Sequence, residues 1–382
     1  MKPSAKRITA IIFFVALFLF VATWYYRMIL LLLAVTVFWR KSIRQWMTSH
    51  NHHRLYPIVV TILVVGVLLF MPKPYSFGRV KLYYQDTQGK RTHAPLLQCV
   101  CNALLPEEEI MNVCMHTTVL GKYVGYSSKL YGESYSKHYA PKGMGQQCID
   151  AVVRHGHIFK FYAPYSALDR NLNTPMSGTY AQVFYQMGIQ KSHSVYVIRP
   201  KHYDSSKTYP LVVFCHGYLG NWQFYNGIWR DLENCIVLSI GTDDLSGIFH
   251  NKEIDDIFTR QIPFLQSLGY KIDMAQLHLI GLSNGGSACR IAYERHGNKF
   301  KSISCISDQS SLRPDPNSKR KCMVNLLGGD DCSAFPKYAK TYKAMGMDAA
   351  CYYEPKDNHF FAITHRKEMI AFLNKRMNNT VK

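Results

Sequence analysis

Short apolar runs alternate with longer segments of helical character along the second half of the chain. Near-continuous apolar runs are typical of strands that are buried on both faces of a sheet. The segments between them, such as 254–268 and 334–345, are long enough for helices that cross over between parallel strands. The pattern therefore predicts an α/β domain with a mostly parallel sheet at about 191–382. The predicted strands are 194–198, 210–215, 235–240, 277–281, 302–307, 322–327 and 349–354.

A different pattern covers residues 1–74, where long apolar stretches alternate with basic positions. Residues 8–39 are apolar except for an aromatic and arginine break at 24–27, and a second apolar run follows the basic segment 40–56. A bilayer core needs about 20 helical residues, and aromatic residues with an arginine are typical of a membrane–water interface. We therefore expect two or three transmembrane helices. Three helices would be at about 8–24, 26–39 and 57–72, and the alternative joins the first two into one tilted helix.

The charge of the chain is concentrated beside these apolar stretches. The net charge is +20, and no acidic residue precedes Asp86. This placement favours a lipid bilayer as a partner, and without a nucleic-acid-binding motif we expect no nucleic-acid partner. With three spans, the positive-inside rule puts the basic segment 40–56 in the cytoplasm and the α/β domain outside it, which is the topology we expect. With two spans, the domain would remain on the cytoplasmic face.

Residues 75–190 contain no motif that we recognise. They are rich in tyrosine, lysine, histidine and glycine, and we interpret them as an extension that packs on the α/β domain. The histidine groups at 50–53 and 154–157 have no partners at metal-ligand spacing, so we expect neither a metal nor a cofactor. The chain has 11 cysteines, an odd number, and several lie in predicted strands. Such use of cysteine as a small buried hydrophobe suits a reducing compartment.

The sequence GLSNG at 281–285 matches the G-x-S-x-G pattern of a serine nucleophile. Ser283 follows the fourth predicted strand and precedes a segment of helical character. The strained turn between such a strand and helix needs small residues, because the two elements approach closely. Gly281, Gly285 and Gly286 supply these small residues. Ser283 is therefore the candidate nucleophile.

A serine hydroxyl needs a base that takes its proton before it can attack a carbonyl carbon. His359 lies just after the last predicted strand, which is where we expect this base. His296 lies at a helix end and His365 inside the terminal helix, and neither position suits a base. His216 lies at a strand end beside Gly217 and suits a structural role in the loop that follows.

An acidic residue is expected to orient the base. The segment after the predicted strand 322–327 offers two adjacent carboxylates, Asp330 and Asp331. The spacing of Asp331 from Gly328 matches a G-x-x-D turn, so Asp331 is the candidate acid and Asp330 the alternative. Asp308, after the preceding strand, is an outside candidate. With either of the two adjacent aspartates, the chain order is serine, aspartate, histidine, as in α/β-hydrolases.

Negative charge develops on the oxygen of the attacked carbonyl group, so two backbone N–H groups are expected to face it. Asn284, directly after the nucleophile, is one candidate donor. Tyr218, in the His-Gly-Tyr loop after the second predicted strand, is the other. Trp222, Phe224 and Tyr225 follow that loop, either as a lining of the substrate pocket or as packing residues.

Two stretches of the chain resemble a known group of enzymes. The stretch YVIRPKHYDSSKTYPLVVFCHGYLGN at 196–221 is similar to the opening of the esterase, feruloyl-esterase and polyhydroxyalkanoate-depolymerase branch of α/β-hydrolases. The stretch YKIDMAQLHLIGLSNGGSACRIAYERHGNKFKSISCIS at 270–307 resembles the approach of the same branch to its G-x-S-x-G-G motif. The resemblance covers about 190–378. It implies an α/β-hydrolase three-layer sandwich that needs no cofactor and hydrolyses esters through an acyl-enzyme.

By this resemblance, Ser283 is the nucleophile, His359 is the base and then the acid, and Asp331 is the orienting carboxylate. Asn284 and Tyr218 are the implied oxyanion donors. The membrane-attached N-terminal third and the lack of a polymer-binding module depart from the secreted depolymerases. We therefore expect a membrane-anchored serine hydrolase, a carboxylesterase that acts on a small-molecule or polymeric ester. The alternatives are a serine peptidase, an acyltransferase and a catalytically inactive membrane scaffold.

Overall fold

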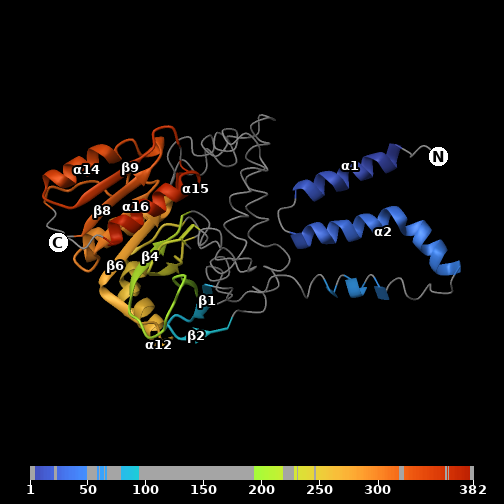
Figure 1. The fold of residues 1–382 in the computed structure, drawn as a ribbon, viewed down its shortest axis with the longest axis horizontal. Helices are drawn as coiled ribbons and strands as arrows, with labels where there is room; N and C mark the ends of the chain where they lie inside the picture. The colour runs from blue at the N-terminus through green and yellow to red at the C-terminus, as the bar shows by residue number, and fades with distance from the viewer. Residues whose placement is uncertain are drawn as a thin grey trace.

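The structure, a computed structural model, contains two helices near the N-terminus and an α/β domain (Figure 1). The structure describes residues 5–20, 24–49, 58–59, 61–63, 65–66, 79–93, 193–217, 228–229, 231–244, 247–317, 322–357, 359 and 361–378. All seven strands predicted from the sequence lie in these described residues, as do the candidate nucleophile, base and acid.

Nine strands in the described part of the chain form one sheet, in the order β2-β1-β3-β5-β4-β6-β7-β8-β9. The neighbours from β5 to β9 are parallel, whereas β1, β2 and β3 pair in antiparallel fashion at one edge. The predicted mostly parallel sheet is therefore confirmed. The strands are β1 Val80–Gln85, β2 Arg91–Thr92, β3 His193–Ile198, β4 Tyr209–Cys215, β5 Ile236–Ile240, β6 Ile272–Leu282, β7 Ser302–Ile306, β8 Met323–Gly328 and β9 Ala349–Tyr353.

The sheet is covered by helices on both faces because successive strand residues point to opposite sides. Leu211, Val213 and Cys215 of β4 join a core with α11–α14, whereas Val212 and Phe214 join a second core with α15 and α16. This three-layer arrangement fits an α/β-hydrolase fold. The covering helices are α11 Asn251–Asp256, α12 Ile262–Ser267, α13 Gly286–His296 and α14 Phe335–Ala344 on one face, and α15 Phe361–Thr364 and α16 Arg366–Asn378 on the other.

The sheet begins earlier in the sequence than the predicted domain boundary at 191. Strand β1 pairs with β3 along its whole length, from Val80 opposite Ile198 to Gln85 opposite His193. The first strands of the sheet therefore come from the segment that the sequence pattern assigned to the 75–190 extension. Apart from residues 79–93 at its start, this extension lies outside the described residues up to β3.

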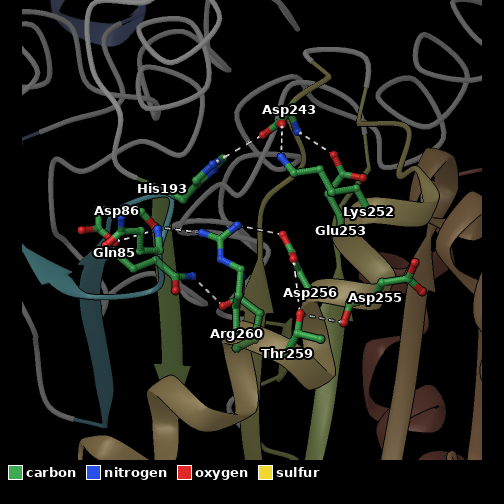
Figure 2. Close-up of polar contacts among 12 residues, drawn as sticks. Gln85, Asp86, His193, Asp243, Lys252, Glu253, Asp255, Asp256, Thr259 and Arg260 are labelled. Carbon is green, nitrogen blue, oxygen red and sulfur yellow. Dashed lines mark hydrogen bonds and ion pairs between the residues drawn. The ribbon is translucent and has the colours of Figure 1, made fainter.

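Polar contacts fix the β1–β2 hairpin to the helices beside it, as Figure 2 shows. The guanidinium group of Arg260 donates to the carbonyl oxygen of Asp86 and to the carboxylate of Asp256, both over 2.8 Å. The side-chain amide of Gln85, which is fully buried, donates to Gln261 over 2.6 Å. The contacts of Arg260 with Asp86 and of Gln85 with Gln261 join residues that are more than 170 positions apart and hold the antiparallel edge of the sheet in place.

The segment 254–268, predicted as one helix, contains a change in helical pitch. It consists of α11, a π-helical turn η2 at Ile257–Gln261, and α12. Pro263 lies in the first turn of α12 and has no backbone N–H, so the regular hydrogen bond to the preceding turn cannot form there. Arg260 and Gln261, whose side chains hold the β1–β2 hairpin, both lie in this π turn.

Seven cysteines lie in the described residues, and all of them are free thiols. Burial raises the pKa of Cys235 to about 12 and that of Cys351 to about 11, so these thiols stay protonated at neutral pH. This agrees with the expectation that the cysteines serve as small core hydrophobes. The buried members are Cys215, Cys235, Cys289, Cys305, Cys322 and Cys332.

The N-terminal region forms two helices, α1 Ala5–Phe20 and α2 Trp24–Ser49, which lie side by side in Figure 1. Phe14 of α1 meets Phe38 of α2 edge-on, with 5.7 Å between ring centroids. Within the described residues, no helix combines the length and the apolar character needed to cross a bilayer.

The predicted spans at 8–24 and 26–39 differ from the observed helices in extent. Helix α1 has only 16 residues, and α2 continues through the basic positions from Arg40 to end at Ser49. Of the predicted third span, the described residues 58–59, 61–63 and 65–66 are helical.

Candidate active site

Ser283 occupies a strained turn between a strand and a helix. It directly follows β6 and begins a short 3-10 turn, η3 Ser283–Gly285, which leads directly into α13. Its φ of +55° lies in the left-handed region, which is uncommon for any residue except glycine. Strain of this kind at a serine between strand and helix is the geometry of a nucleophile elbow.

The glycines around Ser283 allow three elements to approach closely. A Cβ atom on Gly281 would lie 2.3 Å from the carbonyl oxygen of Gly285, and one on Gly285 would lie 2.2 Å from that of Cys215. A Cβ atom on Gly286 would lie 2.2 Å from the carboxylate of Asp308. The helix after the elbow therefore packs directly on strands β6 and β4, as the sequence motif predicts.

A chain of hydrogen bonds joins Ser283, His359 and Asp331. The hydroxyl oxygen of Ser283 lies 2.8 Å from Nε2 of His359. On the other side of the ring, Nδ1 of His359 lies 2.7 Å from the carboxylate of Asp331. Because a carboxylate only accepts, Nδ1 carries the hydrogen and Nε2 is left to accept from the serine. The side chains of His359 and Asp331 are only 7% and 2% exposed, which keeps water away from this contact.

The parallel strands bring these residues together from distant positions in the sequence. Ser283 follows β6, Asp331 lies in a 3-10 turn after β8, and His359 follows β9. The carboxyl ends of parallel strands meet at one edge of a sheet, where ligand and catalytic sites of open α/β sheets are usually found. The edge therefore brings the candidate nucleophile, base and acid into hydrogen-bonding contact.

The other carboxylates considered in the sequence have different surroundings. Asp330 is exposed, and its backbone N–H donates to the carbonyl oxygen of Asp357 over 2.9 Å. Asp308 accepts hydrogen bonds from Ser310 and Ser311 in its own loop. Of the candidate acids, Asp331 is thus the one that the structure places against the base.

The remaining candidate histidines are held by other partners. His216 is fully buried, and its Nδ1 lies 2.7 Å from the carbonyl oxygen of Gly217. Burial lowers the pKa of His216 to about 4, so its ring is neutral at pH 7. His296 contacts Asp255 and His365 contacts Asp357, each over 2.6 Å.

Only part of the predicted oxyanion loop lies in the described residues. Gly217 ends the described segment after β4, whereas Tyr218 and the predicted pocket residues Trp222, Phe224 and Tyr225 lie outside it. Asn284, the other candidate donor, is in the elbow turn directly after the nucleophile.

Ser287, which sequence reasoning did not single out, braces the elbow. Its hydroxyl donates to the carbonyl oxygen of Asn284 over 2.7 Å and accepts from the backbone N–H of Phe249 over 2.8 Å. Phe249 packs in turn on the ring of His216, with 5.3 Å between centroids. The loop after β5 is thereby tied to the turn that carries the nucleophile. The only sequence signal for this role is the place of Ser287 directly after the GG pair of the motif.

No metal-binding group of three or more His, Cys, Asp or Glu side chains occurs in the described part of the chain. Within the described residues, the site brings together a serine, a histidine and an aspartate. Such a set activates a hydroxyl group for attack on a carbonyl carbon.

Comparison with known proteins reveals likeness only to solved structures; no protein-family model and no curated protein matches the chain. A ferulic acid esterase from Anaeromyces mucronatus is 15% identical over 50% of this chain and 85% of its own, with a TM-score of 0.39. The acylaminoacyl peptidase of Pyrococcus horikoshii is 12% identical over 50% of this chain and 40% of its own, with a TM-score of 0.38. A thermostable esterase is 18% identical over 48% of this chain and 58% of its own, with a TM-score of 0.36.

The close approach at the elbow makes a specific prediction for Gly285→Ala. Because φ of Gly285 is −64°, alanine suits the backbone conformation, and the collision with the backbone carbonyl groups of Cys215 and His216 opposes it. Overpacking of this kind costs about 1–3 kcal/mol. We expect Gly285→Ala to lower the free energy of unfolding by at least this amount in chemical denaturation of the purified chain.

The matched control is Gly241→Ala, because a Cβ atom there meets nothing within 4 Å. This substitution should change the free energy of unfolding by less than about 0.5 kcal/mol. Equal stabilities of the two variants would contradict the role assigned to Gly285.

Proposed function

We propose that the protein is a serine hydrolase in which Ser283, His359 and Asp331 form the catalytic triad. The observation that carries the proposal is the continuous hydrogen-bonded chain from the serine to the buried carboxylate. The left-handed turn at Ser283 adds support, because strained backbone is kept where function requires it. The order serine, aspartate, histidine along the chain is the order of α/β-hydrolases.

In the proposed first half-reaction, Ser283 Oγ attacks the carbonyl carbon of the substrate while Nε2 of His359 takes its proton. The carboxylate of Asp331 stabilises the imidazolium ion and holds Nδ1–H in place. The backbone N–H groups of Asn284 and Tyr218 are the proposed donors to the oxyanion. His359 then gives its proton to the leaving group, and an acyl-enzyme remains on Ser283.

In the second half-reaction, His359 takes a proton from a water molecule that attacks the acyl-enzyme. The tetrahedral intermediate collapses, and the proton returns to Ser283 as the carboxylic acid leaves. We propose a carboxylic ester as the substrate, either a small molecule or a polymer. The support for an ester is the resemblance of 196–221 and 270–307 to the esterase branch.

We further propose that the N-terminal helices attach the protein to a lipid bilayer. Apolar side chains on both helices are exposed, whereas such side chains are normally buried in a protein or in lipid. The lysine and arginine residues of this region, which no acidic residue before Asp86 offsets, add attraction to anionic lipid head groups. The most exposed of the apolar side chains are Ile12, Phe13, Val15, Leu33 and Val37.

The triad makes a prediction that separates two neighbouring aspartates. Asp331→Asn removes the charge that orients His359, so kcat for a p-nitrophenyl ester should fall about 10³- to 10⁴-fold. Asp330→Asn makes the same chemical change one residue away at an exposed position, and kcat should stay within about twofold.

Steady-state hydrolysis by the two purified variants and the wild type is the measurement. Equal losses in both variants would argue against Asp331 as the orienting carboxylate. A folded wild type that turns over none of a panel of esters would contradict the proposed ester hydrolysis.

The membrane proposal predicts both attachment and sidedness. The full chain should stay in the membrane pellet after a high-salt wash, and with three spans the α/β domain faces outward. Protease added to spheroplasts should then cleave the chain after residue 75 and leave a cytoplasmic control protein intact.

Release by salt would contradict attachment through the apolar helices. Protection of the domain while an external control is cut would instead favour two spans. The free thiols of the domain would then lie in a reducing compartment.

A further inference from the structure

Asp357 lies two residues before the candidate base and is almost completely buried, with 5% of the residue exposed. Its carboxylate oxygen Oδ2 accepts a hydrogen bond from Nδ1 of His365 over 2.6 Å. The same oxygen accepts from the hydroxyl group of Thr364. The loop that carries His359 is therefore fastened through one carboxylate to the junction of α15 and α16.

The backbone of Asp357 connects the same loop to the loop of the candidate acid. The N–H of Asp330 donates to the carbonyl oxygen of Asp357 over 2.9 Å, one residue before Asp331. A second bond runs from the N–H of Glu354 to the carbonyl oxygen of Gly328 over 3.0 Å. Displacement of Asp357 would therefore disturb the positions of both the acid and the base.

The ring of His365 also packs on an aromatic residue of its own segment. Its ring stacks on Phe361, with 5.6 Å between centroids and 10° between planes. Phe361 is fully buried and also packs on Tyr352 of β9, with 5.4 Å between ring centroids. The donor to Asp357, whose side chain is 30% exposed, is thus packed against a residue of the second core.

We propose that Asp357 and His365 are positioning residues that hold His359 at bonding distance from both Ser283 and Asp331. This inference rests on the proposed function, because it assigns a purpose to the geometry of the triad. A buried carboxylate that loses a donor is left partly unsatisfied, so its loop shifts to find another partner. Displacement of a catalytic group by about 1 Å can lower the rate about 100-fold.

A second histidine–aspartate pair provides the matched control. His296 lies 2.6 Å from Asp255 at the end of α13, so the contact is equally short. Asp255 is 37% exposed, and its other hydrogen-bonding partners include Arg295 rather than any residue of the base loop. Removing the ring from this pair reports the general effect of losing a histidine–aspartate contact.

The experiment compares His365→Leu, His365→Asn and His296→Leu in the full chain. Asparagine keeps an N–H donor close to the place of Nδ1, whereas leucine removes it. The measurements are kcat and KM for a short p-nitrophenyl ester and the temperature of thermal unfolding. We expect His365→Leu to lower kcat about 10- to 100-fold with KM unchanged, because the acyl group binds as before.

His365→Asn should recover most of kcat, and His296→Leu should leave it within about twofold of the wild type. Thr364→Val, which removes only a hydroxyl donor, is the milder variant if His365→Leu fails to fold, and it should lower kcat about threefold to tenfold.

Unchanged kcat in a folded His365→Leu or Thr364→Val variant would overturn the positioning role. A loss in His365→Asn as large as that in His365→Leu would also overturn it, since the donor would then be irrelevant. An equal loss in His296→Leu would identify a general loss of stability. The activity of the wild type separates this inference from the proposed function. If the folded wild type hydrolyses no ester, both the proposed function and the positioning role fail. If it is active, the variants test the positioning role alone.

Discussion

The close approach between the helix after Ser283 and the strands beneath it is the constraint on which the site depends. A Cβ atom at position 281 or 285 would collide with the neighbouring backbone, so both positions need glycine. The close approach that glycine allows accommodates the left-handed turn at Ser283. The turn presents the hydroxyl group at the carboxyl edge of the sheet, where His359 lies 2.8 Å away. The later strands then add the proposed base and acid, because their ends meet at the same edge.

Much of this arrangement is readable from the sequence because it depends on local patterns. Continuous apolar runs mark the buried parallel strands, and β4 and β8 begin within one residue of the predicted positions. Ser283, Asp331 and His359 each follow such a run, so the edge of the sheet brings them together. The glycine pattern identifies the elbow for the same reason, since only a close approach requires three glycines around one serine.

Other features depend on contacts between distant segments and leave little trace in the sequence. Strand β6 begins at Ile272, five residues before the predicted start at 277, because its first residues pair with β4 while staying partly exposed. Strand β1 has no continuous apolar run, and its place in the sheet follows from pairing with β3 more than 100 residues later. The contact of Asp357 with His365 likewise requires knowledge of where the last two helices lie.

The most direct test of the central claim is covalent labelling of the purified full chain with a fluorophosphonate, followed by mass spectrometry of its peptides. An activated serine reacts with such a probe, whereas an ordinary hydroxyl group does not. The account predicts one adduct, on Ser283, that disappears in Ser283→Ala and nearly disappears in His359→Ala. An unlabelled wild type that is folded, or a label on another serine, would contradict it.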